Sequence, residues 1–281
     1  MLESFQFTQT SLRDYLDCPR RFQLRYVLDQ PWPAVETEPL LERERLVELG
    51  RRFHQMAQQH TIGLPTDQIA ASAGDPDLAR WWRNYLNVPP PNLPAVLGAV
   101  RRAEVMLAAT LDPKGFRNPS GLTRIAAKYD LLAIEPGRRA VIVDWKTERK
   151  RPTRAQLAAR TQTRVYRYVL VKAGAALNGG KPFEPEQVAL IYWFAEFPAE
   201  PEVLPYDSAQ HVQDAAFLTS LVGEIVARAD PIWPLTHDET RCRYCVYRSL
   251  CERGVTAGTG DEGDLEDDLD IELAEIEEIA Y

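Results

Sequence analysis

The amino-acid sequence predicts an α/β fold, and three patterns carry the prediction. Two strand-like runs, 124–134 and 140–147, surround the turn signal Pro136-Gly137 and indicate a β-hairpin. The short apolar run QVALIYWF at 187–194 indicates a further, buried strand. Long segments with apolar residues at helical spacing lie before and after these strands. The expected order is helix, three strands, helix, strand and helix.

The N-terminal third is expected to be helical. Residues 11–28 read as a helix broken at Cys18-Pro19, because proline is favoured at the first position of a new helix. Residues 38–60 form a second helix with an apolar stripe of Leu46, Leu49, Phe53 and Met56. A connection rich in Gly and Pro (61–77), a short aromatic helix (78–86) and the rigid spacer Pro89-Pro90-Pro91 follow.

The remaining elements complete the sheet and cover it. Residues 101–111 are expected to form the first strand, and the hairpin follows. Residues 153–172 form a helix that ends at Gly174. After the strand at 187–194, residues 208–229 form the closing helix.

Length and composition fit one globular domain, expected at 1–257, with a tail at 258–281. The chain has 281 residues, 45% of them hydrophobic, and a net charge of −8. Eleven acids and no Lys or Arg fall in the last 21 residues, so the rest holds 33 basic and 30 acidic residues. The tail is expected to be disordered or to bind a partner, since Leu269, Leu273, Ile276 and Ala280 fall at helical spacing among the acids.

The sequence shows no sign of a membrane or export segment. It has no run of 18 apolar residues, and MLESFQFTQT lacks a basic-then-apolar signal pattern. We therefore expect a cytoplasmic protein with no membrane partner. In that compartment, the four cysteines are expected to be metal or cluster ligands instead of disulfides.

Two acids and a lysine in the hairpin predict a catalytic site. Asp130 and Asp144 are equidistant from Gly137, so the hairpin places them opposite each other, where like charges are destabilising. Lys146 shares the face of Asp144, while Trp145 points the other way. A divalent cation and a phosphate would explain this arrangement, which is typical of a metal-dependent phosphodiesterase. An Asp-x-Lys pattern alone is common at strand ends that meet solvent.

Two further sets of residues fit this site. Gln162 and Tyr166 lie four apart on one helix face and could hold a phosphate or base near the metal. An adjacent stripe of Arg160, Arg164 and Arg167 could contact flanking phosphates. His54 follows Gly50 on the earlier helix and is a possible ligand for a manganese-like ion. A packed or surface histidine is the alternative.

The cysteines predict a link between the two ends of the chain. Cys242, Cys245 and Cys251 form a tight C-x2-C-x5-C trio, and Cys18 would supply the fourth thiolate from more than two hundred residues away. Four thiolates bind zinc or an iron–sulfur cluster, and the one-plus-three split favours a cluster. A site of this kind closes a very long loop and is expected to be structural.

In this order and spacing, the motifs resemble those of the PD-(D/E)xK nuclease superfamily. The resemblance covers residues 8–254 through SLRDYLDCPRRFQLRY, GRRFH, KYD, VDWKT, QTRVY and CRYCVYRSLC. It is greatest to the RecB-like, AddB-like branch with an iron–sulfur cluster, which includes the CRISPR-adaptation nucleases. No phosphate-binding G-x-x-x-x-G-K-[ST] motif of a helicase is present, and residues 61–100 and the tail are not part of the common core.

The resemblance implies a restriction-endonuclease-like core, in which helices flank a mixed central sheet and a four-cysteine cluster joins the terminal segments. It implies a [4Fe–4S] cluster on Cys18, Cys242, Cys245 and Cys251. It also implies a catalytic Mg²⁺ or Mn²⁺ at His54, Asp130 and Asp144, with Lys146 beside the attacking water and with Gln162 and Tyr166 holding the strand. Glu104 falls near a position where some relatives carry another acid.

We therefore expect a metal-dependent DNA exonuclease that acts on single-stranded or frayed ends. One alternative is a non-catalytic cluster protein that binds DNA ends or a protein partner, although such a module has no need of opposed acids. Another is a domain held together by structural zinc. The sequence does not fix the cleavage polarity, the preference for DNA over RNA, or the pathway.

Overall fold

The computed structural model of the protein describes residues 5–31, 38–93, 99–112, 123–243 and 245–254. The acidic tail predicted at 258–281 lies outside these residues. The strands are β1 (Gln6–Thr8), β2 (Val100–Leu111), β3 (Thr123–Glu135), β4 (Arg139–Lys146), β5 (Val188–Phe194) and β6 (Glu202–Pro205). The helices are α1 (Gln9–Asp17), α2 (Pro19–Phe22), α3 (Glu38–Thr61), α4 (Thr66–Ala71), α5 (Pro76–Asn87), α6 (Arg154–Ala159), α7 (Thr161–Ala173) and α8 (Ser208–Ala227). Short π- or 3₁₀-helical turns lie at Gln23–Val27, Gly174–Asn178, Pro185–Gln187, Glu239–Cys242 and Ser249–Cys251.

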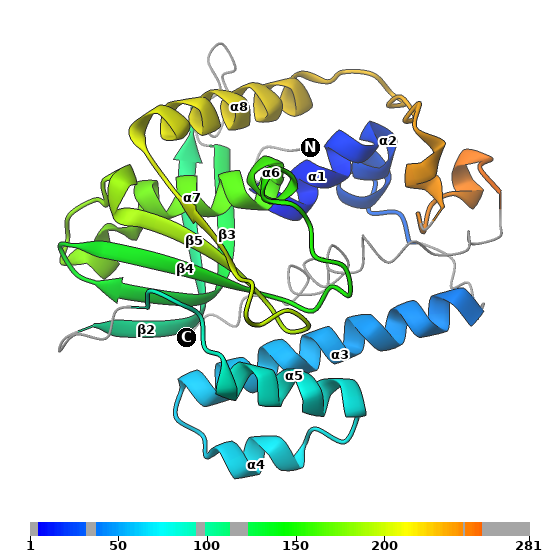
Figure 1. Ribbon diagram of the computed structural model, residues 1–281. Coiled ribbons are helices and arrows are strands. Elements are labelled where there is room, and N and C mark those ends of the chain that lie inside the picture. The colour runs from blue at the N-terminus through cyan, green and yellow to red at the C-terminus, as the bar shows by residue number, and fades with distance from the viewer. Residues whose placement is uncertain (1–4, 32–37, 94–98, 113–122, 244, 255–281) are drawn as a thin grey trace.

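The strands form one mixed, six-stranded sheet (Figure 1). β3 pairs antiparallel with β2 and β4 and parallel with β1, β4 pairs parallel with β5, and β5 pairs antiparallel with β6. The hairpin predicted around Gly137 is present, and Gly137 takes the positive φ of 79° that favours glycine at such a turn. The predicted α/β class and the mixed sheet flanked by helices are therefore confirmed.

The centre of β3 has an open edge. β2 pairs along β3 from Thr123 to Ile134, so β1 and β4 must share the opposite edge. β1 reaches only residues 124–126 and β4 only residues 131–135, which leaves 127–130 between the two strand ends. This gap positions the candidate site, because Asp130 lies at one end of it.

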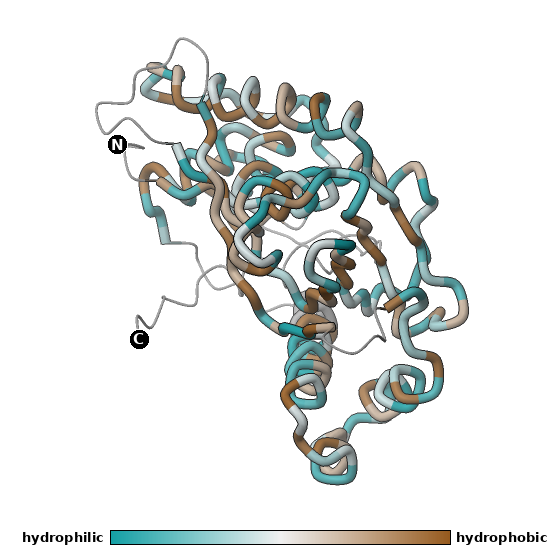
Figure 2. The backbone as a smooth tube through the Cα atoms, turned by 90° about the vertical axis from the view of Figure 1, so that its left-hand side faces the viewer, coloured by the Kyte–Doolittle hydropathy of each residue, from teal (hydrophilic) through white to brown (hydrophobic). Residues whose placement is uncertain are grey.

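Helices cover both faces of the sheet and bury two hydrophobic cores. The first core packs α1, α7 and α8 against one face, around Phe7, Tyr129, Val169 and Phe194. The second packs α3 and α5 against the other face, around Phe53, Trp81, Trp145 and Trp193. Figure 1 shows the two groups of helices on opposite sides, and in Figure 2 the hydrophobic colouring follows the strands between them.

Most predicted elements are present, with differences at short ones. The helix predicted at 38–60 is α3, and its stripe of Leu46, Leu49, Phe53 and Met56 is buried. The single helix predicted at 153–172 is two, α6 and α7, because Arg160 adopts an extended ψ of 139° between them. β1, β6 and α4 were not predicted, since segments of three to six residues are too short to show a period. No helix among the described residues is long and apolar enough to cross a membrane.

The C-terminal segment lies beside the N-terminal helices (Figure 1). The Gln23 side chain donates to the Pro231 carbonyl at 3.0 Å and accepts from the Trp233 backbone N–H at 2.9 Å. The Arg20 backbone N–H donates to the Pro234 carbonyl, and the Phe22 and Trp233 rings stack with centroids 5.6 Å apart. These contacts hold the two ends of the chain together independently of any metal.

Candidate active site

Asp144 and Lys146 form a buried ion pair at the end of β4. The two residues are 2% and 4% exposed, and Lys146 Nζ lies 2.9 Å from Asp144 Oδ2. They share one face because side chains alternate along a strand, and Trp145 points into the opposite core, as predicted. Since burying an isolated charge is costly, each of these two charges requires the other.

The helix α7 brings Gln162 and Tyr166 to this pair. Gln162 Nε2 donates to the other carboxylate oxygen, Asp144 Oδ1, at 2.9 Å, and lies 3.3 Å from the Tyr166 hydroxyl. The Tyr192 hydroxyl from β5 donates to Gln162 Oε1 at 3.3 Å. The spacing of four residues on α7 places the Gln162 amide next to the Tyr166 hydroxyl, with the amide at the carboxylate. Tyr192 was not predicted, because its approach depends on the pairing of β4 with β5.

Asp130 lies in a second set of contacts. Its Oδ2 accepts from the Trp145 backbone N–H at 2.8 Å, and its Oδ1 is 3.2 Å from His54 Nδ1 on α3. Burial raises the pKa of the Asp130 carboxyl, but the charge and hydrogen bond of His54 and the Trp145 N–H outweigh this and bring the pKa below its ordinary value. Asp130 is therefore held as a carboxylate directly beside the strand that carries Asp144.

β2 and β3 are distorted where Asp130 lies. Glu104 has a φ of 55°, in the left-handed region that a side chain other than glycine rarely adopts. It lies between the pairs Ala103–Leu131 and Val105–Tyr129, hence across from Asp130. Tyr129 belongs to the first core and Leu131 to the second, so the alternation of faces changes between them. This change turns Asp130 toward His54.

Glu104 lies close enough to Asp130 for the two charges to interact. Its Oε2 lies 2.6 Å from Lys128 Nζ. Burial, with a further contribution from the Asp130 charge, raises the pKa of the Glu104 carboxyl. Its backbone conformation could not be predicted from the sequence, because nothing in VRRAEVML marks Glu104 as left-handed.

The predicted site residues thus fall into two adjacent groups. Asp144, Lys146, Gln162 and Tyr166 form one, and Asp130 with His54 forms the other. Within the described part of the chain, no three His, Cys, Asp or Glu side chains are placed to hold a metal ion. The donor types nevertheless fit Mg²⁺ or Mn²⁺, since carboxylate oxygens and an imidazole suit these ions and both carboxylates are buried.

The four cysteines lie near one another as free thiols. Cys18 is buried between α1 and α2, and Cys242, Cys245 and Cys251 are half-buried. Burial raises the pKa of the Cys251 thiol to about 11, and the other three cysteines add to the shift. Burial likewise raises the pKa of Cys242, with contributions from Cys245 and Cys18. Four thiols this close fit a cluster or zinc in donor type, although the metal-bound geometry itself is not present among the described residues.

Comparison with known proteins identifies the family. A model of the PD-(D/E)XK nuclease superfamily matches residues 6–252. The chain belongs to this superfamily. A search of the curated proteins found no match.

Two crystal structures are distantly similar to this chain. One is that of SSO0001, with 13% identity, a TM-score of 0.35 and coverage of 84% of this chain and 95% of that chain. The other is that of a candidate exonuclease from Eubacterium rectale, with 10% identity, a TM-score of 0.46 and coverage of 92% of each chain. Both scores are below 0.5, so the family assignment rests on the match to the family model.

Two arginines of the predicted stripe, Arg164 and Arg167, are paired with an acid of α8. Arg164 Nη1 and Arg167 Nη2 lie 3.1 and 3.3 Å from the carboxylate of Asp214 on α8, and Arg167 is buried. Arg160 pairs with the buried Glu148 at 2.6 Å. The interpretation of the stripe as a phosphate grip was wrong for Arg167, since helical spacing does not reveal that a second helix packs over that side chain with an acid.

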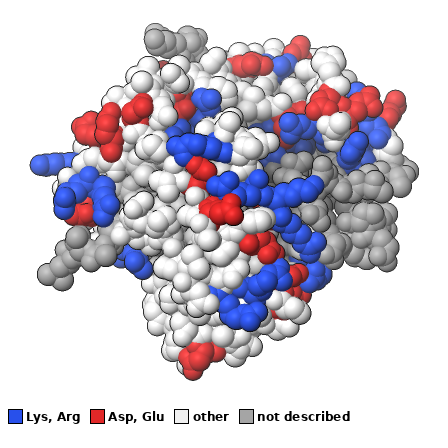
Figure 3. All heavy atoms as spheres, viewed as in Figure 1, with Lys and Arg blue, Asp and Glu red and all other residues white. Residues whose placement is uncertain are grey.

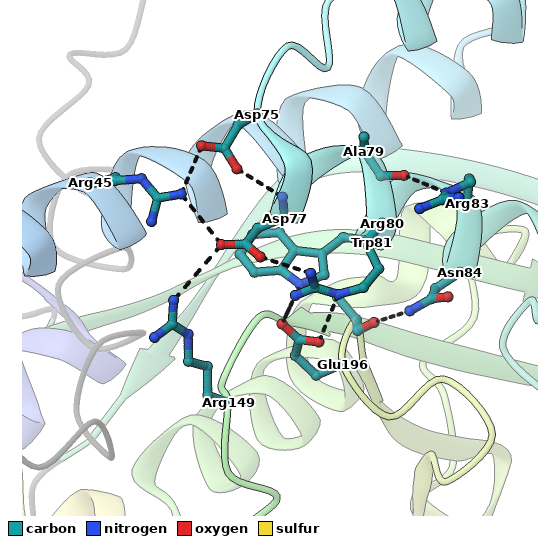
Figure 4. A network of polar contacts seen from close by, with 11 residues as sticks. Arg45, Asp75, Asp77, Ala79, Arg80, Trp81, Arg83, Asn84, Arg149 and Glu196 are labelled. Atoms are coloured by element: carbon teal, nitrogen blue, oxygen red, sulfur yellow. Dashed lines mark hydrogen bonds and ion pairs between the residues drawn. The ribbon is translucent and has the colours of Figure 1, made fainter.

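The helix α5 supports the strand that carries Lys146. Trp81 Nε1 donates to Glu196 at 2.8 Å, and Asn84 Nδ2 donates to the Ala195 carbonyl at 2.8 Å (Figure 4). The Ala195 backbone N–H in turn donates to the Lys146 carbonyl at 2.7 Å. The helix α5 therefore braces the end of β4.

Basic side chains cross the face of the nuclease shown in Figure 3, with acids beside them. In Figure 4, Asp77 lies between Arg45, Arg80 and Arg149. Because acids such as Asp77 offset these arginines, this surface attracts a polyanion less strongly than the number of arginines alone suggests.

Proposed function

We propose that this member of the superfamily is a Mg²⁺- or Mn²⁺-dependent deoxyribonuclease that acts as an exonuclease on single-stranded or frayed DNA ends. The observation that carries the proposal is the buried Asp144–Lys146 pair, joined to Gln162 and lying beside Asp130 on the paired strand. A structural domain gains little from an ion pair buried at such cost, whereas a phosphodiesterase needs carboxylates and an ammonium close together.

Asp130, Asp144 and His54 are the proposed metal ligands. A bound Mg²⁺ or Mn²⁺ would polarise the scissile phosphate and lower the pKa of water. The Lys146 ammonium, held by Asp144, would orient the attacking water and offset negative charge as the bond breaks. Gln162 donates to the Asp144 carboxylate and lies beside the Tyr166 hydroxyl, and these two residues would position the DNA strand. His54 would bind the metal as a neutral imidazole.

We further propose that the chain belongs to the RecB-like, AddB-like branch and holds a [4Fe–4S] cluster on Cys18, Cys242, Cys245 and Cys251. Neighbouring cysteines, Cys18 among them, contribute to the raised pKa values of Cys242, Cys245 and Cys251, and this closeness supports the assignment. The cluster would reinforce the contacts between Gln23 and the C-terminal segment. A brown protein with broad absorbance near about 400 nm supports iron, and a colourless protein with stoichiometric zinc excludes it.

The remaining assignments follow from the sequence. We propose that residues 1–257 fold as one domain, that the protein is cytoplasmic without a membrane partner, and that the tail at 258–281 is available to a protein partner. CRISPR adaptation and DNA repair are the two pathways that the branch suggests.

A second function, DNA-end or partner binding without catalysis, is favoured by one observation. Asp130 is engaged by His54 and the Trp145 N–H, and Asp144 by Lys146 and Gln162, so both carboxylates already have partners within the protein. A binding module of this kind would retain end affinity without turnover.

The two functions are separated by one cleavage assay. End-labelled single-stranded DNA, blunt duplex, duplex with a frayed end, circular single-stranded DNA and RNA of the same sequence are incubated with Mg²⁺ or Mn²⁺. We expect stepwise shortening of the linear single-stranded DNA and of the duplex with a frayed end, and no product from the circular DNA. Tight binding to ends without any product would reject the nuclease and leave the binding function.

A further inference from the structure

A network of charged side chains joins the N-terminal helices to the segment that carries three of the cysteines. Nη2 of Arg21, on α2, lies 2.8 Å from Asp14 Oδ1 and 2.8 Å from Asp17 Oδ2, both on α1. The other oxygen of Asp17, Oδ1, is 3.0 Å from Nη1 of Arg241, the residue directly before Cys242. Asp17 therefore brings Arg21 to the cysteine-bearing segment, which lies beside α2 in Figure 1.

The fourth cysteine lies at the start of the helix that carries Arg21. Cys18 is the N-cap residue of α2, and the Arg21 backbone N–H donates to the Cys18 carbonyl at 2.9 Å. The side chain of an N-cap residue lies beside the backbone of the third helical residue, which here is Arg21. Arg21 is thus placed between cysteines from both ends of the chain.

The charge of Arg21 acts on two of the thiols. Burial raises the pKa of Cys242 and of Cys245, and the nearby Arg21 charge opposes this rise at both. Burial lowers the pKa of Arg21, but the charges of its two acid partners and of Cys245 outweigh this effect and raise it. The interaction is therefore mutual for Arg21 and Cys245.

The Arg21 guanidinium has a donor without an acceptor. The two acids hold Nη2, whereas Nε is enclosed by protein and has no hydrogen-bond partner among the described residues. A buried donor without an acceptor costs roughly 1–3 kcal/mol, and more when the group is charged. An acceptor for Nε must come from the protein itself, because the atom is closed to solvent.

The cysteines can supply this acceptor once they bind a metal. As thiolates, the four cysteines carry more negative charge than a zinc ion or an oxidised cluster core offsets. N–H donors and cations around such a site stabilise the charge that remains on the sulfurs. A guanidinium fixed by two acids is pre-organised for this purpose, because it loses little freedom when it donates to a sulfur.

We propose that Arg21 is a positioning residue of the cysteine site, and that its Nε–H donates a hydrogen bond to the Cys245 thiolate when the four cysteines bind their metal. The inference rests on the proposed metal site and applies to an iron–sulfur cluster or to zinc. Arg21 binds no metal itself but orients one ligand and offsets its charge. Through Asp17 and Arg241, it also steadies the loop that presents Cys242.

The test measures how firmly the full-length protein, as purified, retains its metal. Arg21→Lys is the informative variant, because lysine keeps a positive charge beside Asp14 and Asp17 but has no Nε–H donor. The proteins are incubated with excess EDTA, and the loss of iron or zinc is followed by metal analysis. Removal of an outer-shell partner typically lowers metal affinity about 10–100-fold, so Arg21→Lys should lose its metal at least about tenfold faster than the wild type.

Arg13→Lys is the matched control. Arg13 Nε also lies near Asp17 Oδ2, at 3.5 Å, so the same substitution is made beside the same acid without altering the proposed donor. Urea denaturation of the metal-free proteins shows whether the fold itself is weakened. If the metal is a cluster, loss of a hydrogen bond to sulfur should also lower its midpoint potential in Arg21→Lys alone.

The outcomes separate this inference from the proposed metal site. Faster metal loss from Arg21→Lys alone, without a matching fall in the stability of the metal-free protein, upholds it. Equal rates of loss from Arg21→Lys, Arg13→Lys and the wild type overturn the role of Arg21 and leave the metal site intact. A fall in metal-free stability as large as the change in retention also overturns it, since the role is then structural. A wild type without iron or zinc, or one whose metal persists in Cys18→Ser, rejects the metal site and the inference together.

Discussion

Replacing Lys146 with methionine tests both the energetics and the chemistry of the site. Its ammonium lies 2.9 Å from Asp144 Oδ2, and both side chains are buried. Methionine keeps much of the length of the side chain but removes the charge, leaving a buried carboxylate without its counter-charge. Breaking a buried ion pair costs about 3–5 kcal/mol. We expect the lower end, about 3 kcal/mol, because Gln162 still donates to Asp144 Oδ1.

The expected loss is measurable in two assays. For a chain of this size, each kcal/mol lowers the melting temperature by roughly 2–4 °C, so Lys146→Met should melt roughly 6–12 °C below the wild type. Thermal unfolding followed by circular dichroism measures this shift. Loss of a group that stabilises developing charge lowers the rate of catalysis about 100-fold or more, so Lys146→Met should cleave DNA at least that much more slowly. The rate is measured as the release of label from end-labelled single-stranded DNA.

A double variant separates stability from activity. Lys146→Met combined with Asp144→Asn removes both charges, so no carboxylate remains buried without a counter-charge and much of the melting temperature should return. Cleavage should stay absent, since both proposed catalytic groups are lost. If Lys146→Met melts and cleaves like the wild type, or if the double variant is no more stable than the single one, the account of this pair is refuted.

Three further predictions concern other parts of the fold. Cys18→Ser should lose iron and lower the melting temperature; full iron content and stability would rule out the four-thiolate assignment. Asp214→Ala should destabilise the protein by about 3 kcal/mol, because Arg164 and Arg167 lose their shared partner, and an unchanged denaturation midpoint would contradict this. Burial, together with the hydrogen bond to Glu224, raises the pKa of Tyr15 from 10.0 to about 12. Because the folded-state pKa is the higher one, this stabilisation is complete below pH 10 and is lost as the pH rises toward 12. The free energy of unfolding of the wild type should therefore fall over that pH range relative to that of Tyr15→Phe. If the two proteins lose stability in parallel, the prediction is wrong.

The long elements and half of the site could be predicted from the sequence because they depend on local spacing. The turn at Gly137 sets the hairpin, the two-residue period places Lys146 beside Asp144, and the four-residue period places Tyr166 beside Gln162. Each relation holds within one strand, one helix or one turn, so the order of residues alone determines it.

The features that were missed depend on contacts between distant segments. β1 exists because it pairs with residues 124–126, and the approach of Tyr192 depends on the register of β5 with β4. Arg167 has the helical spacing of a surface residue, yet it is buried, and its guanidinium donates to Asp214, forty-seven positions later in the chain. The left-handed conformation of Glu104 and the gap at 127–130 likewise depend on how β1, β2 and β4 all pair with β3.

The insertion of α4 and α5 shows the same limit. The sequence marked residues 61–77 as a connection and missed α4, whereas the aromatic helix predicted at 78–86 is present as α5. The aromatic residues of α5 pack into the second core with Trp145 and Trp193. The Asn84 side chain of α5 donates to the carbonyl of Ala195, directly after β5, and the Ala195 N–H donates to the Lys146 carbonyl. The supporting role of this segment was invisible because it depends on packing across the sheet.

The most direct test of the central claim compares four proteins on end-labelled single-stranded DNA with Mn²⁺. These are the wild type, Asp130→Asn, Asp144→Asn and the control Glu200→Gln, which alters an exposed acid. Calorimetric titration with Mn²⁺ alone accompanies the cleavage assay. The account predicts cleavage and Mn²⁺ binding by the wild type and Glu200→Gln, and neither by the two aspartate variants. Cleavage by folded Asp144→Asn at the wild-type rate would contradict it.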